Sequence, residues 1–150
     1  MDVAFKLANV DDINLLIEFM REFYELDHVT LDEPAARSAV QQILSNDSFG
    51  KVWLIQVDGN PIGYIVLTLG FSLEFQGRDA FIDEIYIRAA HRGRGVGRRA
   101  IEFVEGVCCS LGVRALHLEV ERENKSAQAM YRKVGFADQD SYLMTKYVAS

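Results

Sequence analysis

Hydrophobic residues recur along the chain with two spacings, one typical of helices and one typical of strands. Near the N-terminus they follow the three- and four-residue spacing that gathers one helix face, at Ile13, Leu16, Ile17, Met20, Phe23 and Tyr24. Asn9 or Asp11 precedes this run and predicts its cap. A second helix is predicted over residues 33–44, with Pro34 in its first turn and its end near Asn46.

Alternating or continuous apolar runs predict the strands. We expect six of them, at residues 3–7, 51–57, 62–69, 81–87, 113–120 and 141–148. The turn at residues 58–61, Asp-Gly-Asn-Pro, predicts a hairpin between the second and third runs. Two more helices are predicted, over residues 95–111 and 125–133. The first stops at Gly112 and the second is capped by Asn124.

This order of elements predicts a single domain over residues 1–150. Its fold class is α/β of the α+β kind, with helices packed on a twisted, largely antiparallel sheet. Parallel pairing is expected only where a helix crosses over, between residues 81–87 and 113–120. The apolar segment 70–78 leaves two interpretations open: an ordinary hairpin end, or a surface that binds a ligand or a second copy.

Composition narrows the function classes. The chain has 150 residues, 49% of them hydrophobic and 25% charged, and a formal net charge of −6, which argues against general nucleic-acid binding. No apolar run approaches the roughly 20 residues that cross a bilayer, and no leader pattern opens the chain, so we expect a cytoplasmic protein. Cys108 and Cys109 are helix neighbours that cannot bridge, and they lack the companions of a zinc site.

The strongest chemical signal is the strand, turn and helix that follow one another over residues 83–98. Glycines at positions 93, 95 and 97 let the backbone approach a ligand closely, and the N-terminus of a helix offers unpaired N–H groups to an anion. Four cations surround this turn: Arg92, Arg94, Arg98 and Arg99. The pattern predicts a phosphate-binding turn. A connection without a ligand leaves the glycines unexplained, and RNA-binding Arg-Gly segments are typical of disordered repeats.

The pattern Arg92-x-x-Gly95-x-Gly97, followed downstream by Asn124, Ala127 and Tyr131, resembles the GNAT superfamily of acyl-CoA-dependent N-acetyltransferases. The resemblance covers essentially the whole chain, and its pattern is similar to spermidine/spermine-like, small-amine members. It implies a sheet of six to seven strands flanked by four helices. It also implies acetyl-CoA as co-substrate, no metal, and direct ternary-complex transfer of the acetyl group to a primary amine.

The resemblance further implies which residues bind acetyl-CoA. Backbone N–H groups of the turn would hold the pyrophosphate, through Arg92, Gly93, Arg94, Gly95, Val96, Gly97 and Arg98. The strand edge would pair with the pantetheine arm at Ile85, Tyr86 and Ile87, and a bulge beside it would open the slot. One strand N–H would polarise the thioester carbonyl. Asn124 would contact the cofactor, and Tyr131 would protonate the departing thiolate.

Acetylation needs a neutral amine, so a carboxylate near the acceptor is expected to attract the cation and remove a proton. Asp83 and Glu84 are the candidates. On a regular strand they point to opposite faces, so only one faces the acceptor unless a bulge intervenes. A glutamate matches position 83 in spermidine/spermine-type members, whereas some aminoglycoside-type members carry the acid at position 84; Asp83 is favoured. Phe81 stands where histone-type members carry a glutamate, which argues against that mechanism.

The segment from Tyr24 to His28 resembles the border of the acceptor pocket in this family and makes Tyr24, Glu25 and Asp27 candidate substrate contacts. We expect a small-molecule amine as partner, with no nucleic acid and no membrane, and the resemblance allows a homodimer. Two alternatives stay open: a non-catalytic acyl-CoA-binding sensor of the same fold, and an acetyltransferase for protein or peptide amines. Structural roles are expected for His91 and His117.

Overall fold

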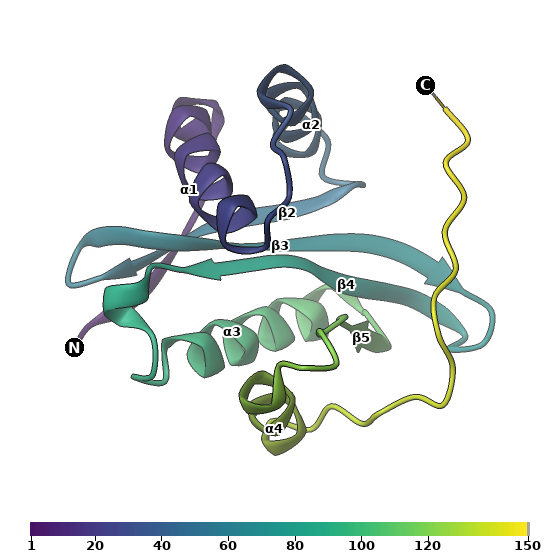
Figure 1. Cartoon of the computed structure of the whole chain (residues 1–150). Helices are drawn as coiled ribbons and strands as arrows, with labels where there is room; N and C mark the ends of the chain where they lie inside the picture. The colour runs from purple at the N-terminus through teal and green to yellow at the C-terminus, as the bar shows by residue number, and fades with distance from the viewer. Residues whose placement is uncertain (150) are drawn as a thin grey trace. The chain divides into compact units, whose positions relative to one another are not determined.

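The computed structural model describes residues 1–149 (Figure 1). Contacts divide the chain into two compact units, Met1–Glu119 and the segment that starts at Val120, and each is described by itself. The first unit holds a five-stranded sheet in the order β1-β2-β3-β4-β5. Its strands are β1 (Val3–Leu7), β2 (Gly50–Val57), β3 (Asn60–Ser72), β4 (Gly77–Ile87) and β5 (Ala115–His117). The first four are antiparallel neighbours, and β5 runs parallel to β4, which confirms the mixed sheet.

All four predicted helices are confirmed. They are α1 (Ile13–Leu26), α2 (Glu33–Ser45) and α3 (Val96–Leu111) in the first unit and α4 (Lys125–Lys133) in the second. Local capping explains their starts: Asn9 caps a 3₁₀ turn that leads into α1, and the Asp32 carboxylate accepts from the Ala35 N–H at the start of α2. Gly112, with a left-handed φ of 72°, ends α3.

The helices of the first unit cover both faces of its sheet, with α1 and α2 on one side and α3 on the other (Figure 1). The α1/α2 side packs Leu16, Ile17 and Phe19 against strand residues such as Leu54 and Tyr64. On the α3 side, a different core packs Ile65, Leu67, Ile101 and Val104, all fully buried. Because both faces are covered, β2 and β3 are nearly continuous apolar runs.

Two strand predictions were wrong. The described residues contain five strands, not the six to seven expected, because residues 141–149 form no regular ladder and β5 is reduced to three residues from the predicted 113–120. An isolated extended segment is not stable without a paired neighbour, whatever its apolar content. Tyr142, Met144 and Tyr147 are accordingly exposed, at 78%, 83% and 92%.

The hairpin between β3 and β4 answers part of the question that the apolar segment 70–78 left open. Residues 70–78 form the end of a long hairpin, in which Ser72 pairs with Gly77 and Gln76 adopts a left-handed φ of 63°. Phe71 and Leu73 project from its tip with 72% and 87% of their surface exposed.

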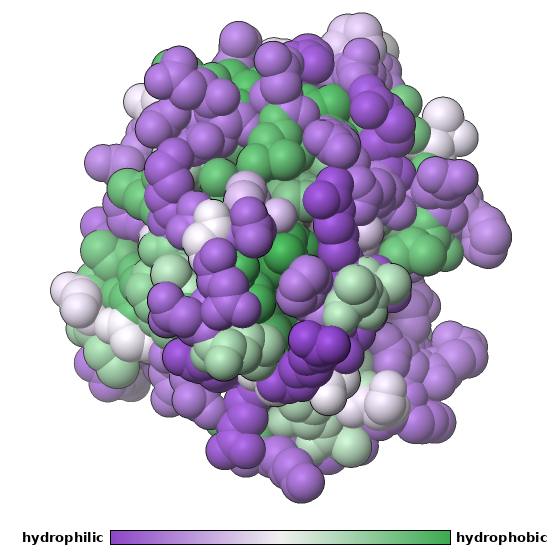
Figure 2. Space-filling model, turned by 90° about the vertical axis from the view of Figure 1, so that its left-hand side faces the viewer, coloured by the Kyte–Doolittle hydropathy of each residue, from purple (hydrophilic) through white to green (hydrophobic). Residues whose placement is uncertain are grey.

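Hydrophilic residues cover most of the face seen in Figure 2, and hydrophobic residues lie between them. Of the helices within residues 1–149, none combines the length and apolar character needed to cross a membrane.

Candidate functional site

The turn between β4 and α3 has the predicted special backbone at two of its three glycines, whereas Gly97 lies within α3. Gly93 and Gly95 have left-handed φ angles of 75° and 81°, and nothing lies within 4 Å of a Cβ built on either residue. No side chain caps the helix, whose first bond runs from the Arg99 N–H to the Gly95 carbonyl at 3.1 Å. The amides of the first turn of α3 therefore lack intrahelical partners and face open space, which fits a pyrophosphate group.

Two arginines of the turn bind neighbouring protein groups, and two remain exposed. Arg92 donates from Nε to the Ile87 carbonyl at 2.7 Å and lies over the Tyr86 ring at 5.7 Å. Arg98 pairs with Glu102 at 2.8 Å along α3. Arg94 and Arg99 form no ion pair with any described residue and remain exposed. At least two cations are thus available to an anion beside the free amides.

β4 offers a free edge next to this turn. It pairs with β5 only from Asp79 to Phe81, so its later residues are bonded on the β3 side alone within the first unit. The Tyr86 carbonyl points at Gly63 of β3, where it would lie 1.9 Å from an added Cβ. Because backbone groups alternate along a strand, Ile85 and Ile87 present theirs to the free edge, whereas Tyr86 does not; the Ile87 carbonyl already accepts from Arg92, which leaves the Ile87 N–H. Of the three predicted edge residues, two are suited to bind an extended arm.

A β-bulge separates the two candidate acids. Val66 and Leu67 of β3 are consecutive, yet they pair with Glu84 and Ile82, which leaves Asp83 as an extra, unpaired residue of β4. A bulge re-aims the side chains beside it, so the alternation of a regular strand does not set the relative orientation of the two acids here. The negative charge of Asp83 acts on both Tyr24 and Glu84, which places the two carboxylates in one electrostatic environment.

Glu84 is held by two tyrosines from other elements. Its carboxylate accepts from the Tyr64 hydroxyl of β3 at 2.8 Å and from the Tyr24 hydroxyl of α1. Burial raises the pKa of Glu84, while the two hydroxyls act in the opposite direction and the charges of Asp83 and Asp27 add to the rise. The same carboxylate and burial raise the pKa of both tyrosines, which therefore stay protonated donors.

Asp83 is exposed on the bulge, although the surrounding protein displaces part of its water and raises the pKa of its carboxyl. Asp27 follows the last residue of α1, and its charge acts on Glu84. None of Asp27, Asp83 and Glu84 forms an ion pair with a described Lys, Arg or His. The structure thus brings three carboxylates without a cationic partner among the described residues near the end of α1, together with Tyr24.

Sequence reasoning missed the groups that fix this arrangement. Tyr64 is 1% exposed and reads as a core residue, and nothing in its own segment marks it as the partner of Glu84. Arg88 also escaped notice: it pairs with Glu22 and Glu18 of α1 at 2.8 and 3.0 Å. Its guanidinium lowers the pKa of Glu22, which also accepts from the Tyr86 hydroxyl at 2.8 Å. These contacts fasten α1 to β4 beside the acids.

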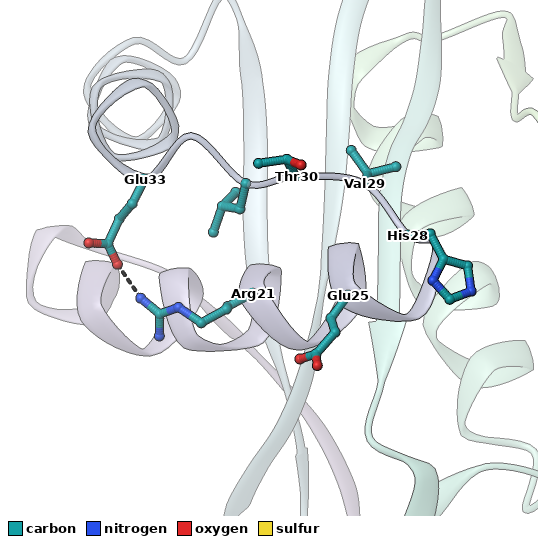
Figure 3. Close-up of a pocket in the computed structure, with 7 residues that line it drawn as sticks. Arg21, Glu25, His28, Val29, Thr30 and Glu33 are labelled. Atoms are coloured by element: carbon teal, nitrogen blue, oxygen red, sulfur yellow. Dashed lines mark hydrogen bonds and ion pairs between the residues drawn. The ribbon is translucent and has the colours of Figure 1, made fainter.

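Two depressions lie along α1. The larger, of about 670 Å³, follows the loop into α2 and is lined by Arg21, Glu25, His28, Val29, Thr30, Leu31 and Glu33 (Figure 3). An ion pair between Arg21 and Glu33 closes one end of it. The smaller, of about 300 Å³, lies towards the turn and is lined by Glu22, Glu25, Leu26, Tyr86, Ala89 and Arg92. Glu25, a predicted substrate contact, borders both, and neither is lined by Asp83 or Glu84.

The predicted residues of the second unit have clear local roles. The Asn124 side chain accepts from the Ala127 N–H at 3.3 Å and caps α4. The Tyr131 ring meets Phe136 edge-on, with centroids 6.0 Å apart, and burial raises the pKa of its hydroxyl. The Tyr131 phenol is therefore protonated at neutral pH, the state that a proton donor needs.

The buried cysteine of α3 is not suited to act as a nucleophile. Cys108 is buried in α3, and burial raises the pKa of its thiol to about 11, so it is not a thiolate at neutral pH. Within residues 1–149, no three His, Cys, Asp or Glu side chains gather as metal ligands would.

Comparison with known proteins decides the family. The sequence profile of the Acetyltransferase (GNAT) family matches residues 14–136. The chain belongs to this family. Closeness to spermidine/spermine-like members in particular is not shown, although a thialysine N-epsilon-acetyltransferase is among the relatives of this GNAT chain.

Three known proteins are similar to this GNAT chain over most of its length. Thialysine N-epsilon-acetyltransferase of Bos taurus is 28% identical over 152 residues, covering 91% of this chain and 85% of its own. A putative [ribosomal protein bS18]-alanine N-acetyltransferase of Bacillus subtilis is 25% identical over 122 residues, covering 81% and 77%. The crystal structure of integron cassette protein HFX_CASS3, from the mobile metagenome of Cole Harbour Salt Marsh, superposes with a TM-score of 0.87 at 35% identity, covering 97% and 91%.

Proposed function

We propose that this GNAT chain transfers an acetyl group from acetyl-CoA to the primary amine of a small molecule. The observation that carries the proposal is the turn before α3, where left-handed Gly93 and Gly95 leave the first-turn amides open beside the free edge of β4. When bound there, acetyl-CoA supplies the acetyl group as an activated thioester. The amides of the turn, with Arg94 and Arg99, neutralise its phosphates, and Ile85 and Ile87 hold its extended arm.

The acceptor end of the proposal depends on charge. Asp27, Asp83 and Glu84 lack cationic partners in the described chain, so together they attract an ammonium group. Glu84 is held by its two tyrosines, whereas Asp83 stands exposed on the bulge. We assign Asp83 as the carboxylate that meets the ammonium and Glu84 as the fixed charge behind it. Tyr24, Glu25 and Asp27 border the acceptor.

Tyr131 is proposed as the acid that protonates the departing thiolate, and Asn124 as a contact to the cofactor. Both assignments rest on the motif from Asn124 to Tyr131 and on membership of the family. A phenol that stays protonated at neutral pH is chemically suited to this task.

A small amine is favoured because the thialysine acetyltransferases act on one and align over most of this chain. A protein α-amine is the second candidate, since another relative is named for the alanine of a ribosomal protein. A non-catalytic acyl-CoA sensor is the third outcome to be tested.

The test is an acetyl-CoA thiol-release assay against thialysine, lysine, linear diamines and a peptide with an N-terminal alanine. We expect the best small amine to exceed the peptide at least tenfold in kcat/KM. Tyr131→Phe should lower kcat by about 100-fold while binding of CoA is kept. A reversed ranking would favour the protein acceptor. Binding of CoA without acetylation of any amine would make the chain a sensor and end the proposal.

A further inference from the structure

A second constellation lies on the first unit, at the end of β5. His117, the last residue of β5, places its Nε2 3.3 Å from the Asp79 carboxylate of β4. The side chains are 24% and 16% exposed. The rings of Phe75 and Phe81 flank the imidazole, with centroids 5.0 and 4.9 Å away. An aspartate behind one nitrogen of a histidine held by neighbouring rings is an arrangement that fixes both ring orientation and tautomer.

The other ring nitrogen is free to act. No hydrogen bond joins Nδ1 of His117 to any described residue, and it does not belong to the buried, unpartnered atoms, which comprise only Nδ1 of His91 among the described residues. The carboxylate of Asp79 favours a proton on Nε2, which leaves Nδ1 as a lone-pair acceptor open to water. This is the geometry of a general base with its orienting carboxylate.

The sheet register directs this base towards the proposed acceptor. His117 pairs with Phe81, and Phe81 pairs with Thr68, two residues from Val66, the partner of Glu84. Paired residues share a face of the sheet, so the imidazole lies on the face of Glu84. Asp83 follows Phe81 by two residues, or about 7 Å along the strand. His117 also marks the fork at which β5 stops pairing with β4 and the free edge begins.

We propose that His117, oriented by Asp79, is the proton acceptor for the amine in the acetyl transfer. The inference deepens the proposed function and rests on it. Asp83 draws in the ammonium, and His117 takes one of its protons at Nδ1. The freed lone pair forms the C–N bond with the thioester carbon, and the C–S bond breaks. The thiolate leaves and is protonated as the nitrogen gives up its second proton, so one amide, one thiol and one imidazolium result.

Asp79 on β4 is the charged group beside the imidazole, and Glu84 lies on the same face of the sheet further along that strand. Phe75 and Phe81 contribute no charge, but they hold the ring in place. Asp79 acts through His117 and is therefore a positioning residue.

The experiment compares the pH dependence of kcat and KM for wild type, His117→Gln, His117→Phe and Asp79→Asn with the best amine of the panel. His117→Phe keeps an aromatic ring between Phe75 and Phe81, which guards against a loss of folding. Without a base, only amine that is already neutral in solution reacts, so the deficit must depend on pH. We expect kcat for both His117 variants to fall about 100-fold at pH 7. Their rates should then climb towards wild type up to the pKa of a primary amine, about 10.

Asp79→Asn should lower kcat about tenfold or more with KM nearly unchanged. A third variant, His117→Ala, should be partly restored by added imidazole, which should have no effect on Asp79→Asn. Asp58→Asn, in the turn between β2 and β3 and in neither cluster, is the surface control and should match wild type. A deficit that stays constant with pH, or His117→Gln within threefold of wild type at pH 7, overturns the inference while the proposed function stands. A wild type that acetylates no amine overturns both.

Discussion

The acidic bulge lies within β4, and the glycine turn follows the end of that strand. The two regions are built in different ways. The turn is made of backbone: Gly93 and Gly95 adopt left-handed angles, and the open amides of α3 follow within a few residues. The bulge is made of side chains from three elements, since Glu84 of β4 is fixed by Tyr64 of β3 and Tyr24 of α1. A site for the shared cofactor can be local, whereas a site for a particular acceptor is assembled by the tertiary fold.

The largest expected effect tests the glycine turn, the region whose site is made of backbone groups. Gly95→Val puts a branched side chain on a residue with φ of 81° and strains the turn. We expect affinity for acetyl-CoA to fall about 100-fold, the equivalent of losing one or two hydrogen bonds to a charged group. Isothermal titration calorimetry with CoA measures this loss of affinity.

Gly112→Val is the matched control. Gly112 has a φ of 72°, open space around its Cβ position, and a place at the other end of the same helix. It should lose similar stability yet bind CoA within about threefold of wild type. Equal losses of binding would mean that strain in α3, rather than the turn itself, is responsible.

A smaller effect is expected in the acceptor half. Asp83→Asn removes the exposed charge of the bulge without changing its shape. We expect KM for the amine to rise about tenfold, as for one charge-assisted hydrogen bond, with affinity for CoA unchanged. Steady-state kinetics with each substrate varied in turn separates the two. Asp47→Asn, at a residue whose side chain is 90% exposed and distant in sequence, should leave both constants as they are. A change in CoA affinity with Asp83→Asn would contradict the separation between a cofactor-binding turn and an acceptor-binding bulge.

The smallest effect concerns stability. Burial raises the pKa of Glu84 in the folded chain, so folding is favoured while this group is protonated and loses stability as pH rises through the folded pKa. Glu84→Gln removes that cost and can still accept the tyrosine hydroxyls. We expect its melting temperature at pH 7.5 to exceed wild type by about 2–4 °C, as for about 1 kcal/mol in a chain of this size. The gap should close towards pH 4.

Calorimetry over pH 4–8 checks this, with Glu74→Gln as the control. Glu74 is exposed at the hairpin tip and should produce no gap that changes with pH. A Glu84→Gln protein that melts lower than wild type at every pH would show that the ionised carboxylate stabilises the cluster.

These two halves also explain how far the sequence alone could go. The turn, the four helices and their caps depend on neighbours within a few residues, so Gly95, Gly112 and Asn124 were assigned correctly as turn and cap residues. The roles of Tyr64 and Asp79 depend on strand register, which carries them to Glu84 and His117 from far away in the sequence. The bulge at Asp83 was conceivable from the sequence, but only pairing with β3 places it. The failed strand at 141–148 shows that an apolar pattern does not create its own partner.

The central claim is that the turn and the bulge serve one direct transfer of acetyl to a small amine. The most direct measurement follows the label of [1-¹³C]acetyl-CoA by mass spectrometry of protein and small molecules, with and without the best amine. We expect one labelled acetyl-amine for each CoA released, only when both substrates are present, and no label on the protein. Label that remains on the protein, or that appears only as acetate, would contradict it.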